Sequence, residues 1–256
     1  MLELIDTHAH LDIPEFDASR AELLAHCEQE GMRAIVVPAV IRSTWLQLQA
    51  ICASDALLWP AYGLHPCYMD QHSLQDVADL ESFLESGAVA VGEIGLDVWH
   101  GDTDLLQQQE IFSAQLSVAK NADLPVVLHA RKTHDLLLKE IRQQHFQAGG
   151  VVHAFSGSLQ QAQKFIDLGF VIGFGGGATY DRAQKLRAIL KSIPLSAVVL
   201  ETDSPDIPPS FARGQQNTPA NLFRITEILA EVLELEPALL AQLTTQNARR
   251  IFRRPG

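Results

Sequence analysis

Leu2-Glu3-Leu4-Ile5-Asp6-Thr7-His8-Ala9-His10 opens the chain, and its order of a short apolar run followed by a polar end is the pattern that decides the fold. Side chains two residues apart leave a β-strand on the same face, so both imidazoles can point at one metal ion. By itself the His-x-His pair has two interpretations, a pair of metal ligands or two polar residues that finish a strand. The other strands of the chain decide between them.

The same alternation of apolar runs and amphipathic segments continues from end to end. Eight apolar runs predict strands at residues 2–5, 34–37, 57–62, 88–91, 125–128, 151–152, 170–174 and 197–200. Apolar residues at three- and four-residue spacing predict helices at 19–30, 44–53, 74–84, 105–120, 134–145, 159–168 and 182–190. A last helical region is expected at about 219–251, after a proline-rich loop at 205–209.

Near-continuous apolar strands are typical of a parallel sheet that is covered on both faces. Repeated βα units give either a closed barrel or an open, doubly wound sheet. Eight strands in 256 residues favour the (β/α)8 TIM barrel. No linker or low-complexity tract divides the chain, so we expect one domain over residues 1–256.

The composition excludes some classes of protein. A net charge of −12 argues against a broad basic face that coats duplex nucleic acid, although a local basic pocket stays open. The amino terminus has no pattern of a secretory signal, and no apolar run reaches membrane-spanning length. Cys27, Cys52 and Cys67 are widely spaced and are expected to be free thiols. These features predict a cytoplasmic protein without a membrane partner.

Polar residues collect at the carboxyl ends of the predicted strands, where the function of a (β/α)8 barrel resides. Six of the eight strands end in such residues, namely His8, His10, His65, Glu93, Asp97, His129, His153, Glu201 and Asp203. Imidazole and carboxylate ligands suit divalent Zn, Mn, Ni or Mg, and the lack of cysteine among them argues against a closed thiolate site. Four imidazoles and two carboxylates exceed the need of one ion with an open position. We therefore expect two ions, with Glu93 as the bridge, about 3.5 to 4 Å apart and sharing a hydroxide.

Six motifs occur in order along the chain. They are Ile5-Asp6-Thr7-His8-Ala9-His10-Leu11-Asp12, Tyr62-Gly63-Leu64-His65-Pro66, Val91-Gly92-Glu93-Ile94-Gly95-Leu96-Asp97, Val127-Leu128-His129-Ala130-Arg131, Val152-His153-Ala154-Phe155-Ser156-Gly157-Ser158 and Leu200-Glu201-Thr202-Asp203-Ser204-Pro205. Over its full length the chain resembles the TatD-type metal-dependent hydrolases, often called TatD-like deoxyribonucleases, within the amidohydrolase-like barrels. The variants at 131–135 and 202–206 look most similar to the YjjV-like branch.

The resemblance implies a cofactor of two divalent metal ions per chain, Zn, Mn, Mg or Ni. It implies that one ion is held by His8, His10, Glu93 and Asp203, and the other by Glu93, His129 and His153. Asp203 has a second expected role as the general base that takes a proton from the attacking water. The alternative for Asp203 is an aspartate that caps the loop before Ser204 and Pro205.

The remaining strand-end residues keep two interpretations each. His65 is placed to contact substrate or an outer water, or it is a satisfied strand-end histidine. Asp97 accepts a hydrogen bond from a ligand histidine, or it caps a turn. Arg131 binds a phosphate oxygen, or it forms a surface ion pair with Asp135. Glu201 is another inward-facing group, or one half of a buried ion pair.

Other candidates are weaker. The stretch 173–177, Gly-Phe-Gly-Gly-Gly, offers backbone amides to a phosphate or simply forms a tight turn. Cys67 has no base at motif spacing and is not expected to act as a nucleophile. The remaining histidines are expected to be solvated, and they are His26, His72, His100, His134 and His145.

The leading functional hypothesis is a deoxyribonuclease that cleaves phosphodiester bonds with a hydroxide held by two divalent ions. Arg131 and Lys132 would guide one strand end, which predicts a preference for ends or single strands. The alternative is a binuclear hydrolase of a small amide, lactone or phosphoester, because fold does not fix substrate. A binding protein in which the ions only stabilise the fold is the third possibility. No obligate protein partner is inferred.

Overall fold

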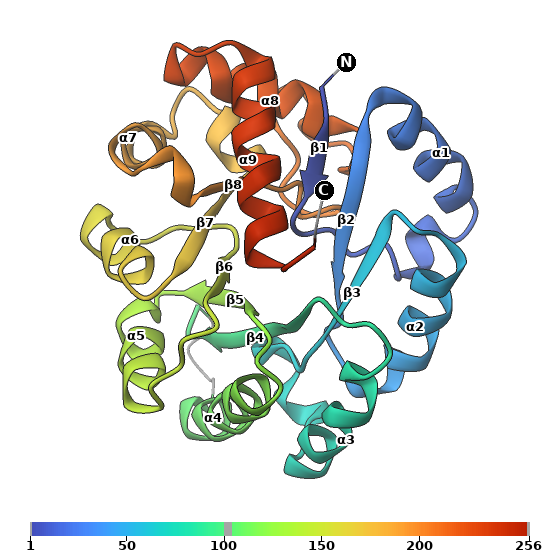
Figure 1. Ribbon diagram of the computed structural model, residues 1–256, viewed down its shortest axis with the longest axis vertical. Helices are drawn as coiled ribbons and strands as arrows, with labels where there is room; N and C mark the ends of the chain where they lie inside the picture. The colour runs from blue at the N-terminus through green and yellow to red at the C-terminus, as the bar shows by residue number, and fades with distance from the viewer. Residues whose placement is uncertain (1, 100–103, 255–256) are drawn as a thin grey trace.

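Eight parallel strands pair in sequence order around one axis in the computed structural model, which describes residues 2–99 and 104–254 (Figure 1). They are β1 (Leu4–Asp6), β2 (Met32–Pro38), β3 (Leu58–Tyr62), β4 (Ala90–Asp97), β5 (Val126–Arg131), β6 (Gly150–Val152), β7 (Phe170–Phe174) and β8 (Val198–Leu200). Backbone hydrogen bonds join the ends of β8 and β1, from Thr7 N to Leu200 O (3.1 Å) and from Asp203 N to His8 O (2.8 Å). The TIM-barrel prediction is confirmed. His100 lies outside the described residues.

Helices alternate with the strands and cover the outside of the barrel. They are α1 (Arg20–Glu30), α2 (Trp45–Ser54), α3 (Leu74–Leu84), α4 (Leu105–Asn121), α5 (His134–Gln143), α6 (Leu159–Ile166), α7 (Gln184–Ser192), α8 (Asn221–Leu233) and α9 (Pro237–Ile251). The helical region expected at about 219–251 is present, and it divides into two helices, α8 and α9. Glu234 ends α8 in the left-handed region (φ 57°), and Pro237 begins α9. Within the described ranges, no helix is long and apolar enough to cross a membrane.

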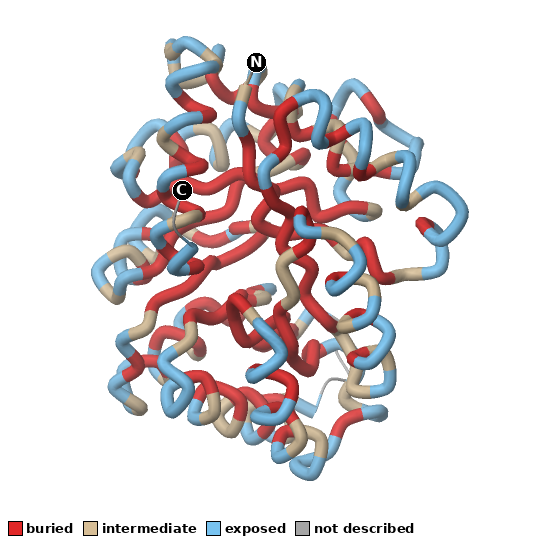
Figure 2. Tube along the Cα trace, turned by 45° about the vertical axis from the view of Figure 1, so that its right-hand side comes forward, coloured by how far each residue is buried: buried red, intermediate tan, exposed pale blue. Residues whose placement is uncertain are grey.

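The core has two layers. Large side chains such as Trp45, Tyr62 and Phe112 fill the space between the sheet and the helices. The barrel interior is lined by small or branched residues, namely Ile5, Ala34, Val36, Ala61, Val89, Ala90, Val127, Val151, Val171 and Val199. Helix α9 lies across the centre of the barrel in Figure 1 and adds Ala248, Ile251 and Phe252 to this inner cluster. In Figure 2 most residues of the strands are buried, whereas many residues of the surrounding helices are exposed.

The alternation of side chains along each strand carries the polar residues above this apolar interior. Three strand ends continue the inward-facing series, as Val127 then His129, Val151 then His153, and Val199 then Glu201 and Asp203. Inward positions near the start of a strand are apolar, and those at its carboxyl end are titratable. The barrel thus brings side chains that are far apart in sequence to one end of its axis.

Two histidines that were expected to be solvated are buried. His72 donates from Nε2 to His65 O at 3.0 Å. His134 packs edge-on against Phe155 and Phe165, and its Nε2 has no hydrogen-bond partner among the described residues. Burial lowers the pKa of His134 to about 4. By contrast, the two surface histidines at 26 and 145 are exposed, as expected.

This environment makes His134 a source of acid sensitivity. The unfolded chain binds a proton at His134 near pH 6.5, whereas the folded chain does so only near pH 4. Its stabilising contribution is therefore complete above pH 6.5 and is lost as the pH falls toward 4. We expect the free energy of unfolding of the wild type to fall by roughly 2 to 3 kcal/mol more than that of a His134→Phe variant over this range.

Urea unfolding followed by circular dichroism at a series of pH values measures this difference. A variant of the exposed His26, His26→Gln, is the matched control and should follow the wild type. An identical pH dependence in His134→Phe and wild type would show that the buried imidazole does not set the acid response.

Candidate metal centre

The carboxylate of Glu93 lies at the centre of the histidines that the barrel brings together. Glu93 is on β4 and is 1% exposed. Its Oε2 is 3.2 Å from His8 Nε2 and 3.6 Å from His10 Nε2. Its Oε1 is 2.9 Å from His129 Nδ1 and 2.8 Å from His153 Nε2. The two oxygens of one carboxylate therefore face separate groups of imidazoles.

The first group of donors lies where β1 meets β8. His8 Nε2 is 3.2 Å from His10 Nε2 and 3.5 Å from Asp203 Oδ1, and His10 Nε2 is 3.8 Å from the same oxygen. Tetrahedral ligands that lie about 2.0 to 2.1 Å from an ion are about 3.3 Å apart. The separations in this group match that value, so the donor set fits a divalent ion. His10 also donates from Nδ1 to Pro38 O (3.2 Å), the backbone contact that commonly orients a ligand histidine.

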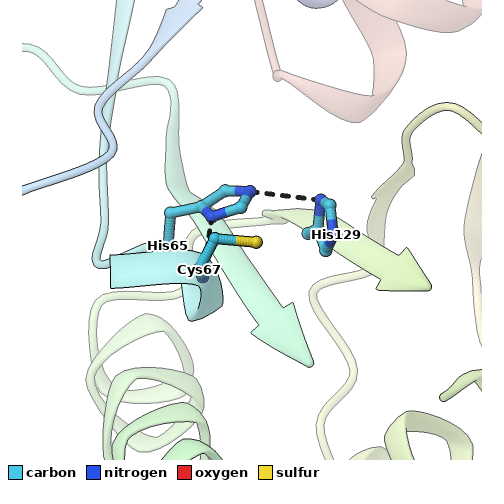
Figure 3. A group of neighbouring side chains, drawn as sticks. All are labelled: His65, Cys67 and His129. Atoms are coloured by element: carbon cyan, nitrogen blue, oxygen red, sulfur yellow. Dashed lines mark hydrogen bonds between the residues drawn. The ribbon is translucent and has the colours of Figure 1, made fainter. Parts of the chain in front are cut away.

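The second group includes one residue more than the resemblance implied. His65 precedes the short helix η3 (Pro66–Gln71), and its Nε2 is 3.2 Å from both Glu93 Oε1 and His129 Nδ1. Figure 3 shows His65 pointing at His129, with the thiol of Cys67 beside them. Cys67 donates from its backbone N to His65 Nδ1 at 3.1 Å. The structure thus places His65 as near to the central carboxylate as the expected ligands.

Asp97 makes both of the contacts that were considered for it. Its Oδ2 accepts a hydrogen bond from His129 Nε2 (2.8 Å), and its Oδ1 accepts one from Trp99 N (2.7 Å) in a turn. Burial alone would raise the pKa of Asp97, but these hydrogen bonds outweigh it and hold the pKa at about 2. The charged carboxylate keeps the proton of His129 on Nε2, which leaves the Nδ1 lone pair facing Glu93.

Two acids that follow β8, Glu201 and Asp203, lie in buried surroundings. Burial raises the pKa of Asp203, which has a left-handed backbone (φ 59°) at the end of the β8 segment. Glu201 accepts a hydrogen bond from Ala154 N (2.6 Å), while its Oε2 has no partner among the described residues. Burial raises the pKa of Glu201 to about 8. The expected alternative of a buried ion pair for Glu201 is not found among the described residues, and the carboxyl group is an inward-facing acid instead.

Asp6 is a functional neighbour that the sequence did not single out. It is buried behind His8 and accepts hydrogen bonds from His8 N (3.2 Å), Thr202 N (3.0 Å) and Thr202 Oγ1 (2.6 Å). Burial raises the pKa of Asp6 to about 7, against the lowering effect of these hydrogen bonds. Asp6 therefore ties the end of β1 to the end of β8, on which His8 and Asp203 depend. Its position inside the first motif was the available signal.

Two glutamines on α4 were also missed. Gln115 accepts from Leu64 N (2.7 Å) and donates to Leu64 O (3.2 Å). Gln108 accepts from Asp97 N (2.9 Å) and donates to Pro66 O (3.2 Å) and Asp97 O (3.0 Å). Both side chains are buried and fix the backbone on either side of His65 and at Asp97. Their seven-residue spacing, on the face that also carries Phe112, was a detectable signal.

The ion pair considered for Arg131 does not form. Asp135 lies 3.8 Å from Lys164 on α6, whereas Arg131 has its Cζ 4.2 Å from the ring centroid of Trp99. Asp135 begins the helix after β5 and faces the next helix along the barrel. Arg131 stays at the carboxyl end of β5 and points toward Trp99, on the side of the candidate centre.

The glycines at 173–177 are explained by close packing. A Cβ at Gly173 would collide with the Glu201 carboxylate, and one at Gly176 would collide with the carbonyl oxygen of Ile207. Close packing, rather than a turn that requires a positive φ, therefore explains Gly173 and Gly176. No separate phosphate role is needed to account for these residues.

Known proteins resemble this chain over almost its full length. The family profile described as TatD related DNase matches residues 5–253. The uncharacterized metal-dependent hydrolase YjjV of Escherichia coli K12 is 41% identical over 98% of both chains. The crystal structure of YjjV, a TatD homologue, superposes with a TM-score of 0.94 over 98% of both chains at 39% identity. A protein of Edwardsiella piscicida named 3'-5' ssDNA/RNA exonuclease TatD is 31% identical over 98% of this chain and 99% of its own length.

The contact between Asp97 and His129 predicts a measurable effect on metal affinity. In an Asp97→Asn variant the amide lacks the negative charge that holds the His129 proton on Nε2. We expect the dissociation constant for Zn²⁺ or Mn²⁺ to rise roughly 10- to 100-fold. Isothermal titration calorimetry of metal-stripped protein measures this change. The exposed Asp167→Asn is a charge-matched control, and an Asp97→Asn affinity equal to that of the control would contradict the orienting role.

Proposed function

This chain belongs to the TatD-related DNase family of metal-dependent hydrolases, and from that premise we propose that it hydrolyses phosphodiester bonds in DNA with two divalent metal ions bound. The observation that carries the proposal is the placement of Glu93, whose two oxygens face separate groups of imidazoles. A carboxylate in that position is suited to bridge two ions. The donor groups lie at the carboxyl end of the barrel, where substrates reach a site of this architecture.

The proposed ligand sets are those that the family resemblance implies, and each set lies around one oxygen of Glu93. The first ion would be held by His8, His10, Glu93 and Asp203, and the second by Glu93, His129 and His153. Two divalent ions bound there supply positive charge to the phosphoryl oxygens and lower the pKa of a bound water. The protein contributes imidazoles in fixed positions, a bridging carboxylate and largely buried surroundings for both.

Asp203 is the proposed general base. Its side chain is largely buried but keeps 12% of its surface exposed to solvent at the carboxyl end of the barrel. Burial raises its pKa, which makes the carboxylate a stronger base than an aspartate in water. It would take the proton of the attacking water and release it to the leaving oxygen or to solvent.

His65 is proposed to contact the substrate rather than to complete the second ligand set. With Glu93, His129 and His153 as its only protein ligands, the second ion keeps a position open for water or substrate, and His65 as a fourth ligand would fill it. His65 has a side-chain exposure of 11%, and Cys67 N fixes its ring by donating to Nδ1. Its Nε2 is then available to a phosphoryl or leaving oxygen.

The positive charge near the candidate centre suits a nucleic-acid substrate, although the negative net charge of the whole chain does not. The chain carries a net charge of −12, yet Arg131 and Lys132 stand together at the carboxyl end of β5. So few cations predict modest, salt-sensitive binding and favour ends or single strands over duplex. The name of the Edwardsiella relative, an ssDNA/RNA exonuclease, supports the same substrate class.

Digestion of end-labelled single- and double-stranded DNA tests the proposal. We expect the metal-loaded wild type to shorten single strands and ends, and to lose this activity on chelation and regain it when the divalent ion is restored. Because Asp203 is both base and ligand, Asp203→Asn should lower kcat by at least roughly 100-fold. Asp206→Asn, three residues further along the chain, is the control.

Parallel assays separate this function from the alternatives. Small amides, lactones and phosphoesters are offered to the same metal-loaded preparation. Turnover of one of these with no cleavage of DNA would replace the nuclease proposal by the small-molecule hydrolase. Cleavage of closed duplex circles in preference to linear ends would contradict the expected substrate form.

The role of His65 makes a second prediction. In His65→Ala we expect both ions to be retained, because the variant removes no assigned ligand, while kcat falls roughly 10- to 100-fold through the lost hydrogen bond. Metal content per chain by mass spectrometry and steady-state kinetics give the two readouts. Loss of one ion per chain would instead make His65 a ligand.

A further inference from the structure

Trp99 is an exposed aromatic residue that lies next to the candidate centre at the end of β4. It follows β4 and is 50% exposed. Its backbone N donates to Asp97 Oδ1 at 2.7 Å, and Asp97 Oδ2 is 2.8 Å from His129 Nε2. One carboxylate therefore joins the backbone of Trp99 to a proposed metal ligand.

Two cations lie against the indole. Arg131 Cζ is 4.2 Å and Lys132 Nζ is 4.4 Å from the centroid of the Trp99 ring. Strand pairing sets this arrangement, because Asp97 pairs with Arg131 across β4 and β5 and Val98 N donates to Arg131 O at 3.3 Å. Within residues 2–99 and 104–254, neither cation has a carboxylate at ion-pair distance.

The other two tryptophans have surroundings that explain them. Trp45 is fully buried and donates from Nε1 to Gly63 O at 3.2 Å. Trp59 lies near the start of β3, where it packs against Phe252 and Arg254. Trp99 does not pack in the core in this way, and half of its surface is exposed at the carboxyl end of the barrel. An exposed indole beside two cations combines stacking with phosphate attraction, as single-stranded nucleic-acid sites do.

We propose that Trp99, Arg131 and Lys132 form a nucleotide platform that holds the unpaired nucleotide next to the scissile phosphate. The base stacks on the exposed part of the indole, and the two cations bind the neighbouring phosphate. The inference rests on the proposed phosphodiesterase function and adds the residues that select the strand. Since the faces of a base are covered in duplex DNA, the platform favours single strands and frayed ends.

Tryptophan fluorescence tests the platform without turnover. An Asp203→Asn background slows cleavage, and a short single-stranded oligodeoxynucleotide is the probe. We expect the oligonucleotide to quench the emission, and Trp99→Ala to remove the quenching and raise the dissociation constant roughly tenfold or more. Trp59→Phe is the matched control and should retain both. Circular dichroism confirms that each variant is folded.

The charged part of the platform has its own readout. Lys132 has a left-handed backbone (φ 61°), which asparagine tolerates, so Lys132→Asn removes the charge with little change of conformation. Removing one phosphate contact should reduce the slope of log affinity against log salt by about 0.7. An unchanged slope would exclude Lys132 from the contact.

Kinetics then distinguish the platform from the centre. In the active protein, Trp99→Ala should lower kcat/KM for the oligonucleotide at least roughly tenfold more than kcat/KM for a small aryl phosphodiester. Equal losses on both substrates, or quenching that persists in Trp99→Ala, would overturn the platform. Absence of DNA cleavage by the wild type would instead overturn the proposed function, while the fluorescence result would still decide whether Trp99 binds a base.

Discussion

A negative charge buried where the ends of five strands meet is the constraint on which this structure depends. Glu93 is almost completely excluded from water, and among the described residues the groups that offset its charge are histidines. Burial would raise the pKa of Glu93, but the imidazoles of His153, His65 and His8 outweigh it and hold the pKa well below its usual range. An uncompensated carboxylate at this depth would strongly destabilise the fold. The contacts that position these imidazoles therefore serve stability and chemistry together.

The surrounding polar contacts follow from that requirement. Asp97 fixes one imidazole, Asp6 fixes the backbone of another, and Gln108 and Gln115 fix the segments on either side of His65. Each of these groups is buried and hydrogen-bonded to backbone or to a ring nitrogen. Of the ring nitrogens that face away from Glu93, those of His8 and His153 (Nδ1 in each) have no partner among the described residues. Two imidazoles are thus held by packing and by the groups that their Nε2 atoms face.

Much of this arrangement could be predicted from the sequence because parallel strands in a barrel all point the same way. Once His8, Glu93, His129 and His153 are each assigned to a strand end, the topology alone brings them together. The apolar runs located seven of the strands to within three residues, whereas β4 extends to Asp97, six residues beyond the predicted end. The division between α8 and α9 was missed because it depends on Glu234, a residue that rarely adopts a left-handed conformation.

Other features depend on tertiary neighbours that no local pattern reveals. His134 is buried because two phenylalanines from later segments enclose it. Arg131 and Asp135 are close in sequence, but a strand end and a helix start direct them to different partners. The glutamines of α4 are polar residues on a buried face, where periodicity predicts apolar ones. Their backbone partners lie more than ten residues away in sequence, so the spacing of residues along the helix does not identify these partners.

The seam between the first and last strands has a consequence for how the centre comes into being. β1 and β8 are three residues each, and the proposed ligands His8, His10 and Asp203 stand on opposite sides of their junction. A chain that ended before residue 198 would contain five of the six proposed ligands and lack the strand that closes the ring. The first donor group is therefore assembled only when β8 has paired with β1. The ability to bind an ion there reports closure of the barrel rather than the presence of any one motif.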